Sequence, residues 1–302
     1  MRDVLKPPLV LCVAGLLVAA GHAAISRPAG PARQAPSAQP SGTPHPEVPD
    51  TEGETCRACH DDLVKGEVVH APVAAAMCTG CHVIAGSGDG TTVALAAGRR
   101  GDTAPLCSTC HDDVAAQLKA PHVHGPAATG DCLGCHVPHA SAYPKLLQAG
   151  GIDACLACHG DVADDLKRKV AHAPAAGACV VCHTPHGGPN AFQLREPVNA
   201  LCLGCHTAPP AEGAAAPVRT LFGRELSAAE ASLAVGPSIP LDALRRRGHP
   251  VTSHPVVGPR DPNDEARPFG CVSCHAPHGS DGPSLKRFGG DDPTSFCIRC
   301  HK

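Results

Sequence analysis

Hydrophobic residues form one long run near the start of the chain and show little regular spacing after it. The run from Leu9 to Ala20 follows the charged Arg2 and Lys6 and precedes Gly21-His22-Ala23, which together make the three parts of a secretory signal peptide. An uncleaved anchor is the alternative, but the run is shorter than the roughly 20 residues that a membrane-spanning helix needs. We therefore predict a signal peptide over residues 1–23 and export across the inner membrane.

The rest of the chain predicts short helices, irregular connections and almost no β-sheet. Asp residues near the start and basic residues near the end favour helices at 113–119 and 161–170. Ser227, three residues before Glu230, resembles a capping box ahead of an amphipathic helix. The Pro-, Ala- and Ser-rich segment 24–52 has no apolar period and predicts an extended tether without a fold.

Composition shows that side chains alone give this chain little material for a core. Only 2% of the residues are aromatic, there is no Trp, and 32 Gly and 32 Pro are present. The net charge of −3 offers no basic patch for nucleic acid. Another apolar component must therefore fill the interior.

A five-residue motif, Cys-x-x-Cys-His, occurs nine times, and we number its copies motifs 1 to 9 in chain order. The motifs use every cysteine except Cys12, which falls in the predicted signal peptide. Their cysteines are Cys56, Cys59, Cys78, Cys81, Cys107, Cys110, Cys132, Cys135, Cys155, Cys158, Cys179, Cys182, Cys202, Cys205, Cys271, Cys274, Cys297 and Cys300. Their histidines are His60, His82, His111, His136, His159, His183, His206, His275 and His301.

The spacing within each motif suits covalent attachment of a haem. Two cysteines three residues apart lie on one side of a helical turn, and the following His comes round to the same side. The thiols can then bind the two vinyl groups while the His binds the iron, which is the c-type haem signature. Zinc sites need a second pair of ligands and no adjacent His. Disulfide scaffolds lack this regular spacing, and a thioredoxin-like pair would occur once.

The motifs predict nine haems c, and these supply the missing apolar bulk of the interior. They divide the chain into a haem domain with haems 1 to 7, an insertion or hinge, and a continuation with haems 8 and 9. The predicted limits of these three parts are 53–206, 207–248 and 249–302.

Ten further histidines after the signal peptide are candidates for the opposite side of each iron, the distal position. Three follow a motif as Pro-His, and three precede a motif as His-x-Pro. One of His249 and His254 is the seventh histidine that the spacing assigns to a haem. The candidates are His70, His124, His139, His172, His186, His278, His249, His254, His122 and His45. His124 is favoured over His122 because it shares the following Pro with its counterparts.

This matching leaves haems 2 and 9 without a local distal partner. Motif 2 continues as Val83-Ile84-Ala85 without a Pro-His. When the motifs are paired in chain order from motif 1, motif 9 has no partner motif. We expect His45 to stay free, because fixing the Pro-rich tether costs roughly 1 kcal/mol or more per residue.

From motif 1 to motif 9 the sequence resembles the multihaem c-type cytochromes with doubled CXXCH motifs. The resemblance implies bis-histidine ligation, a chain of stacked haems wrapped by irregular polypeptide, and respiratory electron transfer in the bacterial envelope or outside the cell. The expected partners are other cytochromes or quinol-linked reductases rather than nucleic acid, and an outer-membrane conduit or self-association is possible. The alternatives are a multihaem oxidoreductase acting on a small nitrogen or sulfur compound, and a structural subunit of a filament or conduit. An electron carrier rather than an enzyme is favoured, because the supply of histidines leaves no iron that needs an open position.

Overall fold

A computed structural model describes residues 43–46, 53–86, 90–206, 220–234, 254–288 and 293–301. The chain divides into the units Met1–Ser41 and Gly42–Lys302, and all described residues belong to the second. The predicted signal peptide, most of the tether and much of the 207–248 segment lie outside the described residues. Within the described part, no helix is both long enough and apolar enough to cross a membrane.

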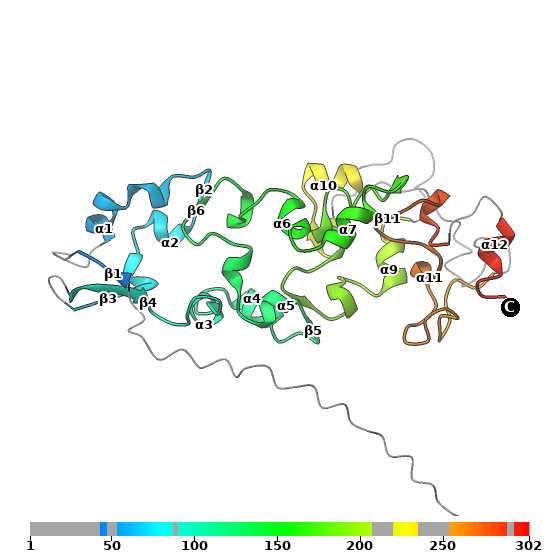
Figure 1. Cartoon of the computed structure of the whole chain (residues 1–302), viewed down its shortest axis with the longest axis horizontal. Helices are drawn as coiled ribbons and strands as arrows, with labels where there is room; N and C mark the ends of the chain where they lie inside the picture. Colours follow the sequence, from blue (N-terminus) through cyan, green and yellow to red (C-terminus); the bar gives the residue numbers. More distant parts are fainter. Residues whose placement is uncertain are drawn as a thin grey trace, which may run out of the picture. The chain divides into compact units, whose positions relative to one another are not determined.

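Helices in the described part are short, as the sequence predicts, and follow one another between α1 and α12 (Figure 1). The α-helices are α1 (Gly53–Cys59), α2 (Ala71–Ala74), α3 (Ala104–Cys107), α4 (Asp112–Gln117), α5 (Gly125–Ala128), α6 (Asp153–Leu156), α7 (Gly160–Asp165), α8 (Cys179–Cys182), α9 (Val198–Leu203), α10 (Ala228–Leu233), α11 (Cys271–Cys274) and α12 (Pro293–Cys297). Short 3-10 helices include η1 (Asp61–Val64), η2 (Cys78–Gly80), η4 (Cys132–Gly134), η5 (Pro144–Leu146), η6 (Ala191–Gln193) and η8 (Pro283–Leu285).

Three helices expected from their end signals are present. Helix α4 begins with two acidic residues, and α7 begins directly after His159 with Asp161 in its first turn. Helix α7 ends at Asp165 rather than near 170, because Val170 enters a strand. Helix α10 has the predicted capping box: the Ser227 side chain accepts the Glu230 N–H, and the Glu230 carboxylate accepts the Ser227 N–H.

Strands are present but nearly all are two residues long. They are β1 (Thr43–Pro44), β2 (Val68–Val69), β3 (His82–Ala85), β4 (Thr92–Leu95), β5 (His122–Val123), β6 (Ala140–Ser141), β7 (Val170–Ala171), β8 (Gly187–Gly188), β9 (Thr220–Leu221), β10 (Arg224–Glu225) and β11 (Gly279–Ser280). The largest described sheet has the antiparallel order β1-β4-β3. Strand β1 corrects the expectation that the tether has no fold throughout, because Thr43 and Pro44 pair with Val93 and Thr92.

One small pairing occurs three times along the chain and links distant segments. Strand β2 pairs with β6, β5 with β8 and β7 with β11, all antiparallel. In each case a segment before an even-numbered motif pairs with the segment after the next even-numbered motif. The β7 and β11 pair joins residues on the two sides of the 207–248 segment.

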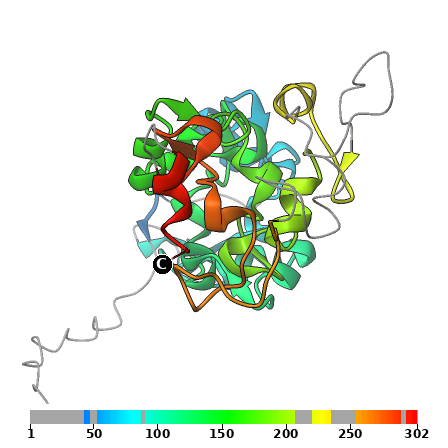
Figure 2. The same cartoon turned by 90° about the vertical axis from the view of Figure 1, so that its right-hand side faces the viewer.

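The described residues bury few apolar side chains. The buried hydrophobic residues are Ala178, Val181, Leu221, Ala231 and Ala234. Leu221 packs with Ala178 and Val181, and Phe222 and Leu233 contact this cluster. Figure 2 shows α10 and the β9–β10 hairpin in yellow, set to one side of α11 and α12. Part of the 207–248 segment therefore packs on motifs 6 and 7, since Cys182 and Cys205 border the same cluster.

A buried carboxylate organises the loop before motif 8. Asp261 has 0% exposure and binds Arg267 through an Nη2 to Oδ2 contact of 2.7 Å. The backbone N–H of Asn263 also donates to Asp261 at 2.8 Å. Burial raises the pKa of Asp261, but the hydrogen bonds from Asn263 and Ser273 and the Arg267 charge outweigh it, so the pKa lies below its ordinary value.

We predict that Asp261→Asn lowers the free energy of unfolding by about 3 kcal/mol, because it leaves Arg267 without its buried counter-ion. The matched control Asp264→Asn removes a more exposed carboxylate and should cost about 1 kcal/mol or less. The Asp261 contribution is complete above the unfolded-chain pKa of about 3.9 and declines as pH falls through the lower folded pKa. Guanidinium unfolding followed by far-ultraviolet circular dichroism measures this, and equal losses in both variants would contradict it.

Candidate functional site

The motifs have the helical turn that their spacing predicts. In eight of the nine, the backbone N–H of the motif His donates to the carbonyl of the first Cys at 2.9 to 3.1 Å. These eight histidines are His60, His111, His136, His159, His183, His206, His275 and His301. The ninth, His82 of motif 2, instead begins strand β3. None of the eighteen motif cysteines, all of which lie in the described part, forms a disulfide.

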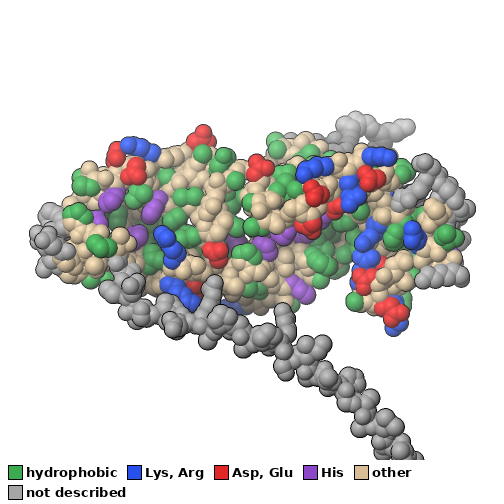
Figure 3. All heavy atoms as spheres, viewed as in Figure 1, with side chains coloured by type: hydrophobic (Ala, Val, Ile, Leu, Met, Phe, Trp, Pro, Cys, Tyr) green, Lys and Arg blue, Asp and Glu red, His purple; other side chains and the backbone are tan. Residues whose placement is uncertain are grey.

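Eight motif histidines have a second imidazole ring beside them, with ring centroids 5.8 to 6.3 Å apart. The pairs are His60 with His45, His82 with His139, His111 with His70, His136 with His186, His159 with His124, His183 with His278, His206 with His172 and His301 with His254. Histidine side chains are visible at several places along the middle of the face in Figure 3.

The spacing of these rings fits a haem iron between them. An imidazole nitrogen binds a first-row metal at about 2 Å, so two imidazoles on opposite sides of one atom have ring centres about 6 Å apart. In the first pair the two Nε2 atoms face each other at 3.5 Å. Among the described residues, no group of three or more His, Cys, Asp or Glu surrounds one point as a zinc site requires.

The ring pairs follow one register. A His-x-Pro histidine before an even-numbered motif faces the next odd-numbered motif, as His70 before motif 2 faces His111 of motif 3. A Pro-His histidine after an even-numbered motif faces the preceding even-numbered motif, as His139 after motif 4 faces His82 of motif 2. The two classes differ in the angle between the rings.

The rings of the first class are nearly parallel, with interplanar angles of 16° to 20°. Those of the second class are tilted by 31° to 35°. Each class thus has its own repeated geometry, which the shared landmark of its histidines already suggested.

This register differs from the matching made on the sequence, which left motifs 2 and 9 without a local distal partner. His82 has His139 beside it, and His301 has His254. The motifs that fall outside the register are 1, 8 and 9, because His45 and His254, which face motifs 1 and 9, belong to neither class. The structure places His45 beside His60 of motif 1, although the tether was expected to leave His45 free.

Backbone contacts fix the paired segments. The N–H groups of His70, His124 and His172 each donate to the carbonyl of a Pro-His histidine at 2.9 Å, and the acceptors are His139, His186 and His278. Nδ1 of His70 also bonds the Pro138 carbonyl, and Nδ1 of His172 the Pro277 carbonyl. An Nδ1 held by a carbonyl leaves Nε2 for a metal.

Two ring positions depart from the register but share a local signature. His45 and His254 are each followed directly by Pro, and in each the ring Nδ1 bonds the carbonyl of that Pro at 2.7 and 2.8 Å. His249 is also followed by Pro, but it lies outside the described residues. The His-Pro dipeptide is the signal that would have favoured His45 from the sequence.

Electrostatics favour the neutral imidazole that binds metals. Burial lowers the pKa of His139, His186 and His278, and neighbouring imidazoles lower it further. Burial also lowers the pKa of His172, although the hydrogen bond to the Pro277 carbonyl acts in the opposite direction. A neutral histidine needs to lose no proton before it ligates.

Successive motifs lie against one another. The side chains of Cys155 and Cys179 interact, as do those of Cys202 and Cys271. Cys107 interacts in the same way with Cys132. Motifs 3 to 8 therefore meet in consecutive pairs through their first cysteines, which brings their attachment points together.

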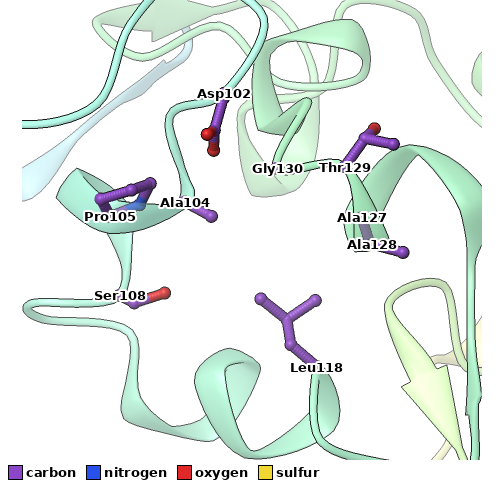
Figure 4. A pocket seen from close by; sticks show the side chains of 9 residues that line it. All are labelled: Asp102, Ala104, Pro105, Ser108, Leu118, Ala127, Ala128, Thr129 and Gly130. Carbon is purple, nitrogen blue, oxygen red and sulfur yellow. The ribbon is translucent and has the colours of Figure 1, made fainter.

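A separate open pocket of about 420 Å³ lies between α3, the end of α4 and α5 (Figure 4). Its lining is small and mostly apolar, with Asp102, Ser108 and Thr129 as the polar side chains. It contains no histidine and no thiol, so it contributes no candidate ligand.

The model of the doubled CXXCH motif matches four regions, residues 70–116, 124–164, 172–210 and 265–302, which cover more than half of the chain. The chain belongs to this family. It is therefore a multihaem c-type cytochrome that functions in electron transfer. The matched regions pair motifs 2 with 3, 4 with 5, 6 with 7 and 8 with 9, so this cytochrome has motif 1, not motif 9, outside the pairs. No curated protein matches the chain.

The ring positions predict different effects for two neighbouring histidines of this cytochrome. His124→Ala should turn one low-spin haem high-spin, because the ring beside His159 is lost. His122→Ala should leave the spectrum unchanged, since His122 contributes its backbone to β5 and forms none of the eight ring pairs. Electron paramagnetic resonance of the two purified variants distinguishes these outcomes, and the reverse pattern would refute the register.

Proposed function

We propose that the mature protein carries nine haems c and transfers electrons along them. Each haem is bound by the two cysteines of one CXXCH motif, and its iron by the histidine of that motif and one further histidine. Haem supplies reversible one-electron chemistry when bound. The observation that carries the proposal is the set of eight histidine ring pairs at the spacing of a shared iron. His249 is proposed as the distal ligand of haem 8, because it has the His-Pro dipeptide of His45 and His254.

An electron carrier is supported over an oxidoreductase by the same pairs. An enzyme acting on a small nitrogen or sulfur compound needs an iron with an open position for substrate. A ring on each side of the iron fills both axial positions. In the described part, eight motif histidines have such a partner, so these haems are proposed to exchange electrons only.

Consecutive contacts between motifs support a continuous electron path. The first cysteines interact between motifs 3 and 4, 5 and 6, and 7 and 8, and α1 contacts η2 between motifs 1 and 2. Weaker electrostatic interactions between cysteines link motif 2 to 3, 4 to 5, 6 to 7 and 8 to 9. We propose that the path runs in chain order from haem 1 to haem 9. The proposed partners at its ends are other redox proteins, such as cytochromes or quinol-linked reductases, with a conduit or self-association as the structural possibility.

The proposed location is the periplasm or the cell exterior. Its support is the signal peptide that the sequence predicts at residues 1–23. Cleavage after Ala23 would leave Ala24 as the first residue of the mature protein.

Intact mass spectrometry tests the haem count and the processing together. The expected mass is that of the chain from Ala24 plus nine haems that resist extraction by acidified solvent. Changing Cys271 and Cys274 to Ser should remove the mass of one haem, because the thioether bonds of motif 8 are lost. A native mass with fewer haems would contradict the count, and retention of residues 1–23 would contradict the processing.

His45→Ala should convert one haem to a high-spin form, because the structure holds His45 beside His60 through β1 and a 2.9 Å bond from the His45 N–H to the Thr91 carbonyl. Pro46→Ala is the matched control, since it keeps the carbonyl that bonds Nδ1 of His45. Magnetic circular dichroism reports the spin state of each variant. A fully low-spin His45→Ala protein would show that haem 1 takes its ligand elsewhere.

A further inference from the structure

In three motif histidines, Nδ1 forms a hydrogen bond that fixes the orientation of the ring. His136 donates to the Lys145 carbonyl at 2.9 Å, and His183 and His275 donate to the Phe192 and Ser284 carbonyls at 2.8 Å. All three belong to even-numbered motifs that continue with a Pro-His. The acceptor in each case lies in the turn that follows.

Left-handed backbone aims these carbonyls at the rings. Lys145, Phe192 and Ser284 have φ values of 61°, 58° and 54°, a region that residues other than Gly seldom adopt. After each turn the chain returns to the motif, where a bridge joins the motif His to Leu147, Leu194 or Lys286. The repeated strain indicates that the surrounding structure fixes the turn three times in the same way.

The chain also returns to motif 2, but it does so without a left-handed turn. His82 pairs with Leu95, and the Ala96 N–H donates to the Cys81 carbonyl at 2.8 Å, as the Gln148 N–H does to Cys135 in motif 4. However, Thr92–Leu95 is extended in β4, the central strand of β1-β4-β3. Its carbonyls therefore point along the sheet, and Nδ1 of His82 is buried without a hydrogen-bond partner among the described residues.

We propose that His82 gives haem 2 a higher reduction potential than haems 4 and 6. The proposal rests on the bis-histidine ligation proposed above. A hydrogen bond from Nδ1–H to a carbonyl raises the basicity of a ligating imidazole and so stabilises the ferric iron. Haem potential responds to hydrogen bonds of this kind. The ligand of haem 2 lacks this bond, so its ferrous state is relatively favoured.

The proposed axial ligands are matched among these three haems. Their distal rings, those of His139, His186 and His278, all come from a Pro-His after an even-numbered motif. The angles between the paired rings are 31°, 32° and 35°. An electron shared among the three haems therefore rests mainly on haem 2, towards the motif 1 end of the path.

The test is a potentiometric titration of the low-spin haem signal in the holoprotein, with one distal ligand removed at a time. His139→Ala should remove the low-spin step of haem 2, and His186→Ala that of haem 4. The step lost in His139→Ala should lie at the higher potential. If His139→Ala creates no high-spin haem, the ligation is wrong. If it does, but the lost step is at the same or a lower potential than that lost in His186→Ala, the inference about His82 is wrong.

A second pair of variants tests the hydrogen bond itself at motif 6. Phe192→Pro cannot adopt the positive φ of the turn, because proline fixes φ near −65°. It should raise the midpoint of haem 6, identified as the step that disappears in His278→Ala. Phe192→Gly accepts the same φ and should leave that midpoint unchanged; the Phe192 side chain is 78% exposed, so little packing is lost in either variant. An unshifted midpoint in a fully loaded Phe192→Pro protein would overturn the proposal, and if that variant does not assemble, the His139 and His186 comparison decides alone.

Discussion

Each proposed iron needs a second imidazole that its own motif cannot provide, and the described fold depends on meeting this requirement. A CXXCH turn positions one histidine, and the partner ring must stand about 6 Å away on the other side. In the eight described pairs that partner comes from a separate segment. The pairs therefore act as tertiary contacts in a chain whose described part buries only five hydrophobic residues. The proposed ligation would replace much of what a side-chain core does in other proteins.

The histidine pairs also explain why strands of two residues are enough to hold distant segments together. A two-stranded ladder is marginally stable by itself. Here each of the three repeated ladders is extended by a backbone hydrogen bond between two histidines whose rings lie beside adjacent motifs, as His70 lies beside motif 3 and His139 beside motif 2. A displacement of one ligand is therefore felt at the neighbouring site. The spacing of the proposed electron path and the folding of the polypeptide are set by the same contacts.

The sequence was informative wherever the determining contacts are local. The helical turn found in eight of the nine motifs, the Ser227 cap and the position of His124 rather than His122 beside a motif histidine all follow from residues a few positions apart. The local sequence did not predict which motif each of these histidines faces. His139 lies just after motif 4 but faces motif 2, because a paired strand returns it across the chain. His45 was misjudged because β1 has only two residues and forms against β4, which local pattern does not reveal.

The departure of motif 2 from the Pro-His pattern has a structural reason in this register. A Pro-His there would face an even-numbered motif before motif 2, and the chain has none. Its place is taken by the β3–β4 hairpin, whose outer side accepts β1 and so brings His45 to His60. The hairpin also replaces the left-handed turn whose carbonyl would have accepted a hydrogen bond from Nδ1 of His82. One local change thus places a second ring at motif 1 and leaves Nδ1 of His82 without an acceptor among the described residues, so the proposed difference between haem 2 and its counterparts follows from the β3–β4 hairpin.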